Sequence, residues 1–128
     1  MVKMICAALS CALSLALGGA DALLVALIVL TILDFMTGII KGVMTKSLSS
    51  GVMWHGGFRK ILIYMVVALA VMTDRAFGGT QVVRGLTIGY YISTEGLSIL
   101  ENVTMCGVPL PVALQETLKN IKEHGGEK

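Results

Sequence analysis

Charged residues are scarce in this chain of 128 residues. They make up 14% of it, against roughly 25% in an average soluble domain, while 55% of the chain is hydrophobic. With a mean hydropathy of +0.85, the sequence lacks the polar surface that a small water-soluble globule needs. The net charge of +2 is small, and no basic stripe with interleaved aromatics argues for nucleic-acid binding. The composition predicts a membrane protein that does not bind nucleic acid.

Metal-ligand and catalytic patterns are also missing. The three cysteines form no CxxC pair, their odd number argues against a disulfide scaffold, and the two histidines are far apart; these residues are Cys6, Cys11, Cys106, His55 and His124. The sequence has no glycine-rich phosphate loop and no plausible Ser/His/Asp arrangement. We therefore expect no metal, no cofactor and no enzymatic activity.

Four apolar runs predict an all-α integral membrane protein with about four transmembrane helices. The second run is the most secure, because nine Leu, Ile and Val residues from Leu23 to Leu33 offset the cost of inserting Asp34, about 2.5–3.5 kcal/mol. A polar link rich in glycine and serine follows it over residues 42–58. One membrane helical domain, 1–111, would contain the spans, which we place at about 4–20, 22–42, 60–77 and 85–102.

The remaining segment, 112–128, predicts a short amphipathic helix and a charged tail. Proline and glycine residues end the apolar part of the chain between Gly107 and Pro111. Beyond them, apolar residues recur at i, i+4 and i+7, opposite charged ones: Leu114, Leu118 and Ile121 against Glu116, Lys119, Lys122 and Glu123. We expect this helix in the cytoplasm or on the membrane surface.

The first apolar run admits two interpretations. Lys3, the apolar stretch after it and the small residues Gly18-Gly19-Ala20 are the parts of a signal peptide. However, Asp21 is a good helix N-cap and another apolar helix begins at once, so the same residues suit the tight turn of a membrane hairpin. We favour the uncleaved hairpin.

The basic residues predict the orientation. With four spans, eight of the ten Lys and Arg residues lie on the side of the termini, and only Arg75 and Arg84 on the other; the eight are Lys3, Lys41, Lys46, Arg59, Lys60, Lys119, Lys122 and Lys128. This bias predicts a multi-pass protein of the bacterial cytoplasmic membrane with both termini in the cytoplasm. If the fourth run did not span the membrane, five Lys and Arg residues would lie on each side and the bias would disappear, which is why we prefer four spans.

Polar residues recur at helical spacing within two of the apolar runs. On the second run they are Thr31, Asp34, Thr37, Gly38 and Lys41, and on the fourth they are Glu95, Ser98, Glu101 and Asn102. Intramembrane acids are candidate functional groups, and Asp74 lies near the end of the third run. We take these residues as pore-lining or assembly residues, or as static contacts between helices, and we expect Trp54, Arg59 and Lys60 to anchor the chain at the membrane surface. Lys41 is a possible partner for an acid on a neighbouring helix.

The same residues resemble a known family. Asp34 with Thr37-Gly38, Ser49-Ser50, Gly56, Arg59-Lys60, Asp74 and the run "EGLSILEN" that leads to "GVPLP" are similar to the phage holin family of the toxin-secretion and lysis type, found in Gram-positive phages and clostridia. The matching residues fall within 34–111 in the family's order. Gly51 and Met105 depart from the residues usual in the family, and neither removes a charge from a span.

The resemblance implies a small membrane protein that forms homo-oligomers in the lipid bilayer. Such a protein opens holes at a set time, and an endolysin or a large toxin then passes through. Two alternatives belong to other classes. One is a small four-helix proton-coupled transporter that uses Asp34 or Glu95, although the spans hold few aromatics to wall a chamber. The other is a non-conducting accessory scaffold of a secretion system.

Overall fold

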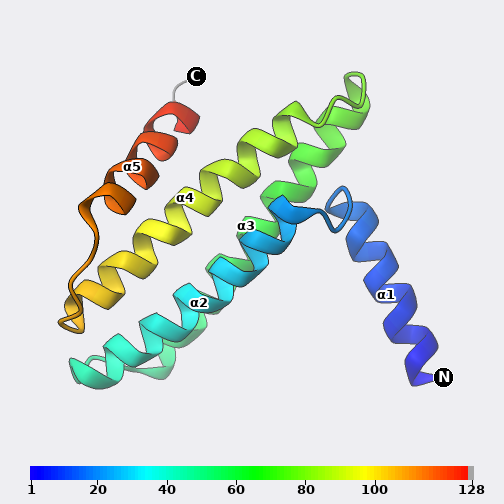
Figure 1. Cartoon of the computed structure of the whole chain (residues 1–128). Coiled ribbons are helices and arrows are strands. Elements are labelled where there is room, and N and C mark those ends of the chain that lie inside the picture. The colour runs from blue at the N-terminus through cyan, green and yellow to red at the C-terminus, as the bar shows by residue number, and fades with distance from the viewer. Residues whose placement is uncertain (127–128) are drawn as a thin grey trace.

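The computed structural model describes residues 1–126, and these residues are helical apart from short connections (Figure 1). The helices are α1 (Val2–Ala16), α2 (Ala22–Met44), α3 (Ser50–Ala76), α4 (Val82–Met105) and α5 (Val112–Gly126). The prediction of an all-α fold is confirmed. The last two residues of the predicted charged tail, including Lys128, lie outside the described residues.

Helices α2, α3 and α4 form the central bundle, in which α4 contacts both of the others (Figure 1). Its apolar core is small and consists of Leu27, Ile63, Val67 and Ile88, with Leu17, Tyr64, Tyr91 and Ile92 packed against it. Within residues 1–126, seven hydrophobic side chains are buried, and so are seven polar or charged ones. The interior of the bundle is therefore unusually polar.

The outer faces of α2 and α3 are apolar. Large hydrophobic side chains point away from the bundle, such as Ile32 (53% exposed), Leu62 (58%) and Leu69 (65%). Both helices are long and apolar enough to cross a membrane. This arrangement suits a hydrocarbon solvent, in which apolar side chains face lipid and polar ones face protein. The four-span arrangement stays a prediction, because α4 carries more polar residues and α1 is only 15 residues long.

Helix α3 begins before the predicted third span. The Ser49 side chain accepts a hydrogen bond from the Val52 backbone N–H (3.2 Å) and so caps a helix that runs through Gly56 and Gly57. The glycine and serine content of this segment predicted a link that reaches residue 58, but the connection between α2 and α3 ends at Ser49. This shift places Lys60 well inside a helix.

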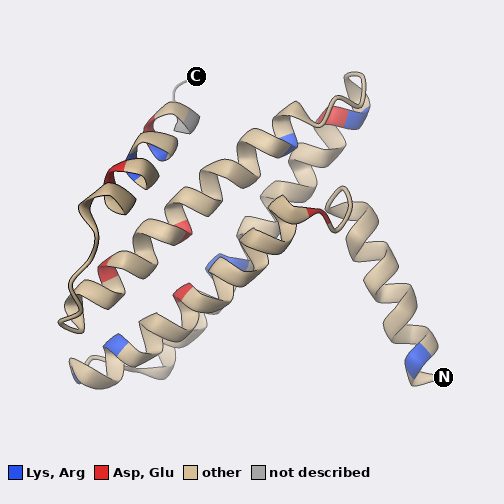
Figure 2. Ribbon diagram, in the orientation of Figure 1, with Lys and Arg blue, Asp and Glu red and all other residues tan. Residues whose placement is uncertain are grey.

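The two terminal helices attach to the bundle differently. Helix α5 folds back along α4, whereas α1 projects away from one end of the bundle and has no buried residue (Figure 1). Gly96 makes the approach of α5 possible, since a Cβ atom there would lie 3.0 Å from the Leu118 Cδ1 atom. Charged residues are spread along the length of α5 and are sparse on the central helices (Figure 2).

Candidate functional site

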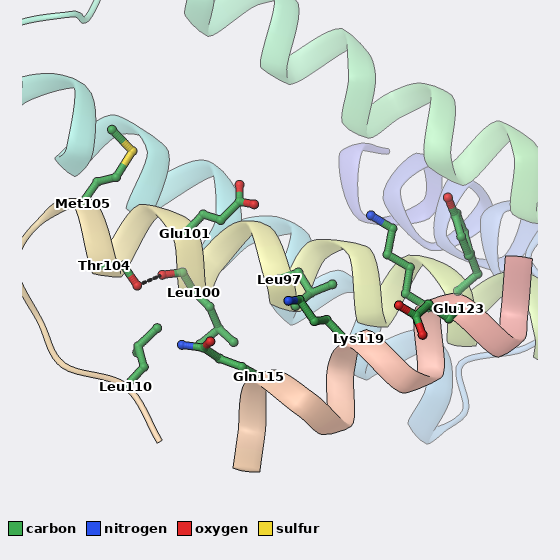
Figure 3. Close-up of a pocket in the computed structure, with 11 residues that line it drawn as sticks. Leu97, Leu100, Glu101, Thr104, Met105, Leu110, Gln115, Lys119 and Glu123 are labelled. Carbon is green, nitrogen blue, oxygen red and sulfur yellow. Dashed lines mark hydrogen bonds between the residues drawn. The ribbon is translucent and has the colours of Figure 1, made fainter. Parts of the chain in front are cut away.

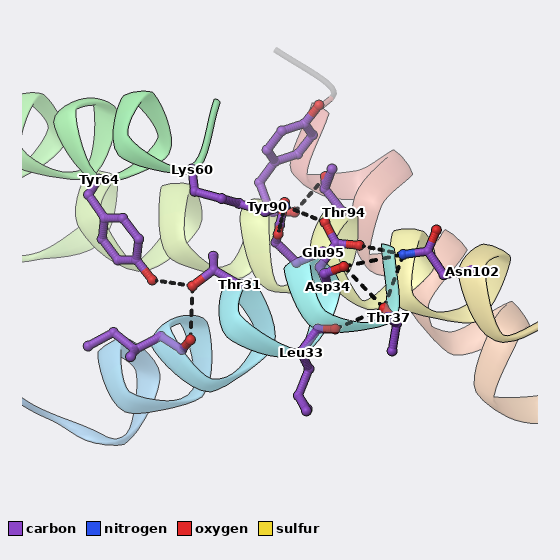
Figure 4. Close-up of polar contacts among 11 residues, drawn as sticks. Thr31, Leu33, Asp34, Thr37, Lys60, Tyr64, Tyr90, Thr94, Glu95 and Asn102 are labelled. Atoms are coloured by element: carbon purple, nitrogen blue, oxygen red, sulfur yellow. Dashed lines mark hydrogen bonds and ion pairs between the residues drawn. The ribbon is translucent and has the colours of Figure 1, made fainter. Parts of the chain in front are cut away.

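The centre of the bundle holds an ionic contact between three helices. The Lys60 ammonium group on α3 contacts both the Asp34 carboxylate on α2 and the Glu95 carboxylate on α4 (Figure 4). Asp34 is 8% exposed and Glu95 is 1% exposed. With all three groups ionised, two negative charges share one positive charge. This contact holds the three helices of the bundle together.

Asn102 extends the contact along α4 toward the connection with α5. Its side-chain Nδ2 group donates to Asp34 Oδ1 (3.1 Å) and to Thr37 Oγ1 (3.0 Å). Gly38 lies beside this contact, and a Cβ atom there would be 3.8 Å from the same Nδ2 atom, an ordinary van der Waals distance. Asp34 and Thr37 of the second run thus meet Asn102 of the fourth run directly, and Asp34 meets Glu95 through Lys60.

A pair of hydroxyl groups also joins α2 to α3. The Thr31 and Tyr64 hydroxyl oxygens lie 2.7 Å apart, and the Thr31 hydroxyl also donates to the Ile28 carbonyl (2.9 Å). We call the whole set the polar cluster: Thr31, Asp34, Thr37, Lys60, Tyr64, Glu95 and Asn102. In the described part of the chain, every buried side-chain nitrogen and oxygen has a hydrogen-bond partner. The cluster therefore leaves none of its fully buried side-chain polar atoms without a partner.

A separate polar contact, the Arg84 junction, joins the turns at the opposite end of the bundle. The Arg84 guanidinium group is 2% exposed and donates to the Leu17 carbonyl (2.7 Å), the Gly19 carbonyl (3.0 Å) and the Asp21 carboxylate (2.7 and 3.0 Å). The α1–α2 turn is thereby fixed to the start of α4. Hydrogen bonds from Arg84 and from the Leu24 backbone N–H lower the pKa of Asp21 from 3.8 to about 2.

Asp74 completes this end of the bundle. Its carboxylate accepts hydrogen bonds from the backbone N–H groups of Val83 (3.0 Å) and Arg84 (2.8 Å) and so caps α4. It takes over the capping role because Gln81, the residue before α4, is left-handed and makes no side-chain cap. Arg75 donates to the Leu15 carbonyl (2.7 Å), which ties α1 to the same place.

The other predicted site residues lie at the edges of the bundle. Lys41, Arg59 and Ser98 line a cavity near the α2–α3 connection. Glu101 lines a groove of about 820 Å³ between α4 and α5, together with Lys119 and Glu123 of α5 (Figure 3). Trp54 is exposed and stacks on Phe58 with ring centroids 5.7 Å apart.

The structure differs from the sequence-based expectation in two roles. Lys60, expected at the membrane surface, is the shared partner of the two buried acids, whereas Lys41 forms no ion pair within residues 1–126. Tyr64 and Arg84 were not among the predicted site residues. Tyr64 does fall one helical turn after Lys60, so the spacing of α3 could have drawn attention to it.

These contacts are structural and electrostatic rather than catalytic. No group of three or more His, Cys, Asp or Glu residues that could hold a metal ion occurs in the described part of the chain. The polar cluster offers ionisable groups and hydroxyls inside a bundle with an apolar exterior. Such a site can bind water, protons or another polar surface if the helices separate.

Comparison with known proteins points to one family, both by a family model and by individual relatives. The bacteriophage holin family matches residues 11–123. An uncharacterized 14.9 kDa protein of Clostridium perfringens is 43% identical over 105 residues, which are 81% of this chain and 80% of the relative. A protein named "Probable holin" from Bacillus phage phi105 is 36% identical over 102 residues, 80% of this chain and 76% of the relative. No solved structure matches at a significant level.

Proposed function

Because the chain belongs to the bacteriophage holin family, we propose that it acts as a holin that self-associates in the bacterial cytoplasmic membrane and forms holes there. The holes would release an endolysin or a large toxin. The family consists of membrane proteins without enzymatic activity, and the two long apolar helices of this chain agree with membrane insertion. The resemblance found in the sequence is confirmed by the family match.

The position of the polar cluster is the observation that carries the proposal. Asp34, Lys60 and Glu95 are buried among helices whose outer faces are apolar. Charged groups at membrane depth must face protein or water, so the cluster is stable only while the bundle is closed or when water reaches it. Helices that separate in an oligomer would turn these groups toward a shared aqueous lumen while their apolar faces stay in lipid.

The energetics favour such an exchange of partners. Burial of an ion pair costs several kcal/mol of desolvation for each ion, and the mutual attraction of the charges offsets this cost only in part. Water in a lumen would restore the hydration of Asp34, Lys60 and Glu95. The closed and open arrangements can therefore lie close in free energy, as a protein that opens at a set time requires. The hydroxyls of Thr31, Thr37 and Ser98 would hydrate the same lumen.

We propose the four-span topology with both termini in the cytoplasm. The Arg84 junction supports it, because it joins the α1–α2 turn to the α3–α4 turn and so puts both turns at one end of the bundle. When α2 and α3 both cross the membrane, as in the four-span topology, these two turns must lie on the same side. The segment 112–128 then begins on the cytoplasmic side.

Helix α5 would set the timing of opening. It lies along α4, so Lys119 and Lys122 stand beside a helix that we place in the membrane (Figure 3). Charges at that depth are costly unless they meet water, which favours a move of α5 to the membrane surface. That move would uncover the face of α4 around Gly96 for a second copy of the chain.

Expression of the chain alone in bacteria tests the proposal. Membrane potential, viability and the escape of a co-expressed cytosolic wall hydrolase would be followed over time. We expect normal growth, then an abrupt loss of potential together with release of the hydrolase. Continued growth with an intact potential would contradict the proposal and favour a scaffold, and slow cation movement without hydrolase release would favour a transporter.

A further inference from the structure

A cavity of about 390 Å³ lies at the end of the bundle where α2 passes into α3. Its walls come from the end of α2, the α2–α3 connection, the first turns of α3 and part of α4. Gly42 lets the connection pack closely on α2, since a Cβ atom there would lie 3.0 Å from the Leu48 Cδ1 atom, whereas a Cβ atom on Gly56 would make an ordinary contact with the Phe35 ring at 3.8 Å. The cavity borders the polar cluster, because Asp34, Lys60 and Asn102 belong to the cluster and also line the cavity.

The cavity has a surplus of positive charge. Lys41, Arg59 and Lys60 all line it, and the one carboxylate among its lining residues is that of Asp34. Lys60 and Asp34 already contact each other in the polar cluster. No carboxylate in residues 1–126 lies within 4 Å of the charged groups of Lys41 or Arg59. Two cationic side chains are therefore available for an anion.

The rest of the lining is apolar or carries hydroxyls. Phe35, Ile39, Leu48, Val52 and Met53 supply the apolar part, and Ser47 and Ser98 supply hydroxyl groups. A site for a free inorganic anion would gain nothing from this much apolar wall. A molecule with an anionic head and an apolar body matches both parts of the lining. In the bilayer around a membrane protein, the abundant molecules of that kind are anionic phospholipids.

We propose that this cavity binds the headgroup of an anionic phospholipid. Its phosphate contacts the Arg59 guanidinium and Lys41 ammonium groups, since guanidinium matches phosphate oxygens in geometry and charge. Its glycerol and first acyl carbons pack against Phe35 and Leu48. Trp54 is exposed and stands in the sequence between the cavity residues Met53 and His55, where it would act as an interfacial anchor. The bound lipid would lie beside Lys60 and so would stabilise the closed bundle.

Trp54 provides the test, because it is the only tryptophan of the chain. The full chain would be reconstituted in vesicles of one fixed composition, phosphatidylglycerol and phosphatidylcholine in equal parts, and bromine atoms would be placed on the acyl chains of one lipid or the other. Bromine quenches tryptophan fluorescence at short range, so the ratio of the two quenching values reports which lipid lies next to Trp54. This measurement does not depend on hole formation, so its result is separate from that of the lysis experiment.

We expect stronger quenching from brominated phosphatidylglycerol, with a local enrichment of about fivefold for each cation in contact with the phosphate. The Lys41→Gln and Arg59→Gln variants should each lower this ratio toward that of the bulk lipid. Lys46→Gln is the matched control, because Lys46 is an exposed lysine of the same connection that does not line the cavity. It should leave the ratio unchanged.

Three results would overturn the proposal. Equal quenching by the two brominated lipids would show that the cavity does not select an anionic headgroup. An equal loss in Lys46→Gln and Lys41→Gln would show that diffuse surface charge attracts the lipid. Loss of the preference on addition of inorganic phosphate, but not of the same ionic strength of chloride, would assign the site to a free anion. Circular dichroism of each variant confirms that the helices remain folded.

Discussion

Asp34 on α2 and Glu95 on α4 lie 61 positions apart in the sequence and share one cation, Lys60 of α3. Neither acid has another basic side chain within 4 Å in residues 1–126, so a single lysine neutralises part of the charge of both. This arrangement makes Lys60 the residue on which the closed bundle most depends. The consequences of its removal can be measured.

Lys60→Met should destabilise the folded chain by about 3–5 kcal/mol, because it leaves two buried carboxylates without a cation. Lys60→Arg should cost much less, since it retains the charge and can reach both acids. Thermal unfolding in detergent micelles, followed by circular dichroism, measures the difference. Lys3→Met is the control, because Lys3 is exposed in the first turn of α1. A midpoint for Lys60→Met equal to that of the control would contradict this role.

The triple variant Asp34→Asn, Glu95→Gln, Lys60→Met should separate stability from opening. It removes all three charges at once, so the desolvation cost of the buried ions disappears together with their mutual attraction. We expect its unfolding midpoint to recover toward that of the parent chain. If the cluster lines the open hole, however, the time of lysis should change markedly. A stable variant that lyses cells on the normal schedule would show that the cluster serves only to hold the helices together.

Much of this site could be predicted from the sequence, for a local reason. Acidic and hydroxyl residues at spacings of three and four within an apolar run must share one face of a helix. Such a face must turn toward protein or water, so Asp34, Glu95 and Asn102 were expected to meet a polar partner. The structure brings these three residues together.

The partner itself could not be predicted. The pairing of a lysine with two acids depends on where its helix begins and how that helix is rotated. Because Gly56 and Gly57 are typical of a flexible link, the sequence did not predict that α3 begins before them. Once Ser49 caps that helix, Lys60 lies in its third turn and faces α2 and α4. Arg84 was equally hidden, because its acceptors include two backbone carbonyl groups that no sequence pattern reveals.

Gly18→Ala should weaken the Arg84 junction. Gly18 has φ +83°, and a Cβ atom there would lie 2.5 Å from Arg84 Nε and 2.7 Å from its Cδ. Gly19→Ala is a matched control, because Gly19 has φ +105° and no heavy atom within 4 Å of its Cβ position. Both variants carry backbone strain of about 1–3 kcal/mol, but only Gly18→Ala must also displace the guanidinium group. A lower unfolding midpoint for Gly18→Ala than for Gly19→Ala would show this, and equal midpoints would exclude it.

The stability that the Arg84 junction gives to the fold should decrease at acidic pH. Because the folded chain lowers the pKa of Asp21 from 3.8 to about 2, the ionised carboxylate stabilises the folded state. This stabilisation is fully present above about pH 4 and is lost as the pH falls toward 2. Unfolding midpoints measured across this range should fall more steeply in the parent chain than in Asp21→Asn, which has no carboxylate to protonate. Identical slopes for the two proteins would rule out a contribution from Asp21.

The packing of α5 on α4 should be separable from the rest of the fold. A Cβ atom on Gly96 would already crowd Leu118, so Gly96→Val should push α5 off α4, whereas a Cβ atom on Gly89 of the same helix would meet nothing within 4 Å. Trypsin cleavage after Lys119 and Lys122 measures the release, because a helix docked on its neighbour resists proteolysis and a detached one does not. We expect cleavage to be faster in Gly96→Val than in Gly89→Val, with α2–α4 intact in both. If α5 times the opening of the hole, Gly96→Val should also advance lysis; unchanged lysis with faster cleavage would mean that α5 leaves α4 without any effect on the hole.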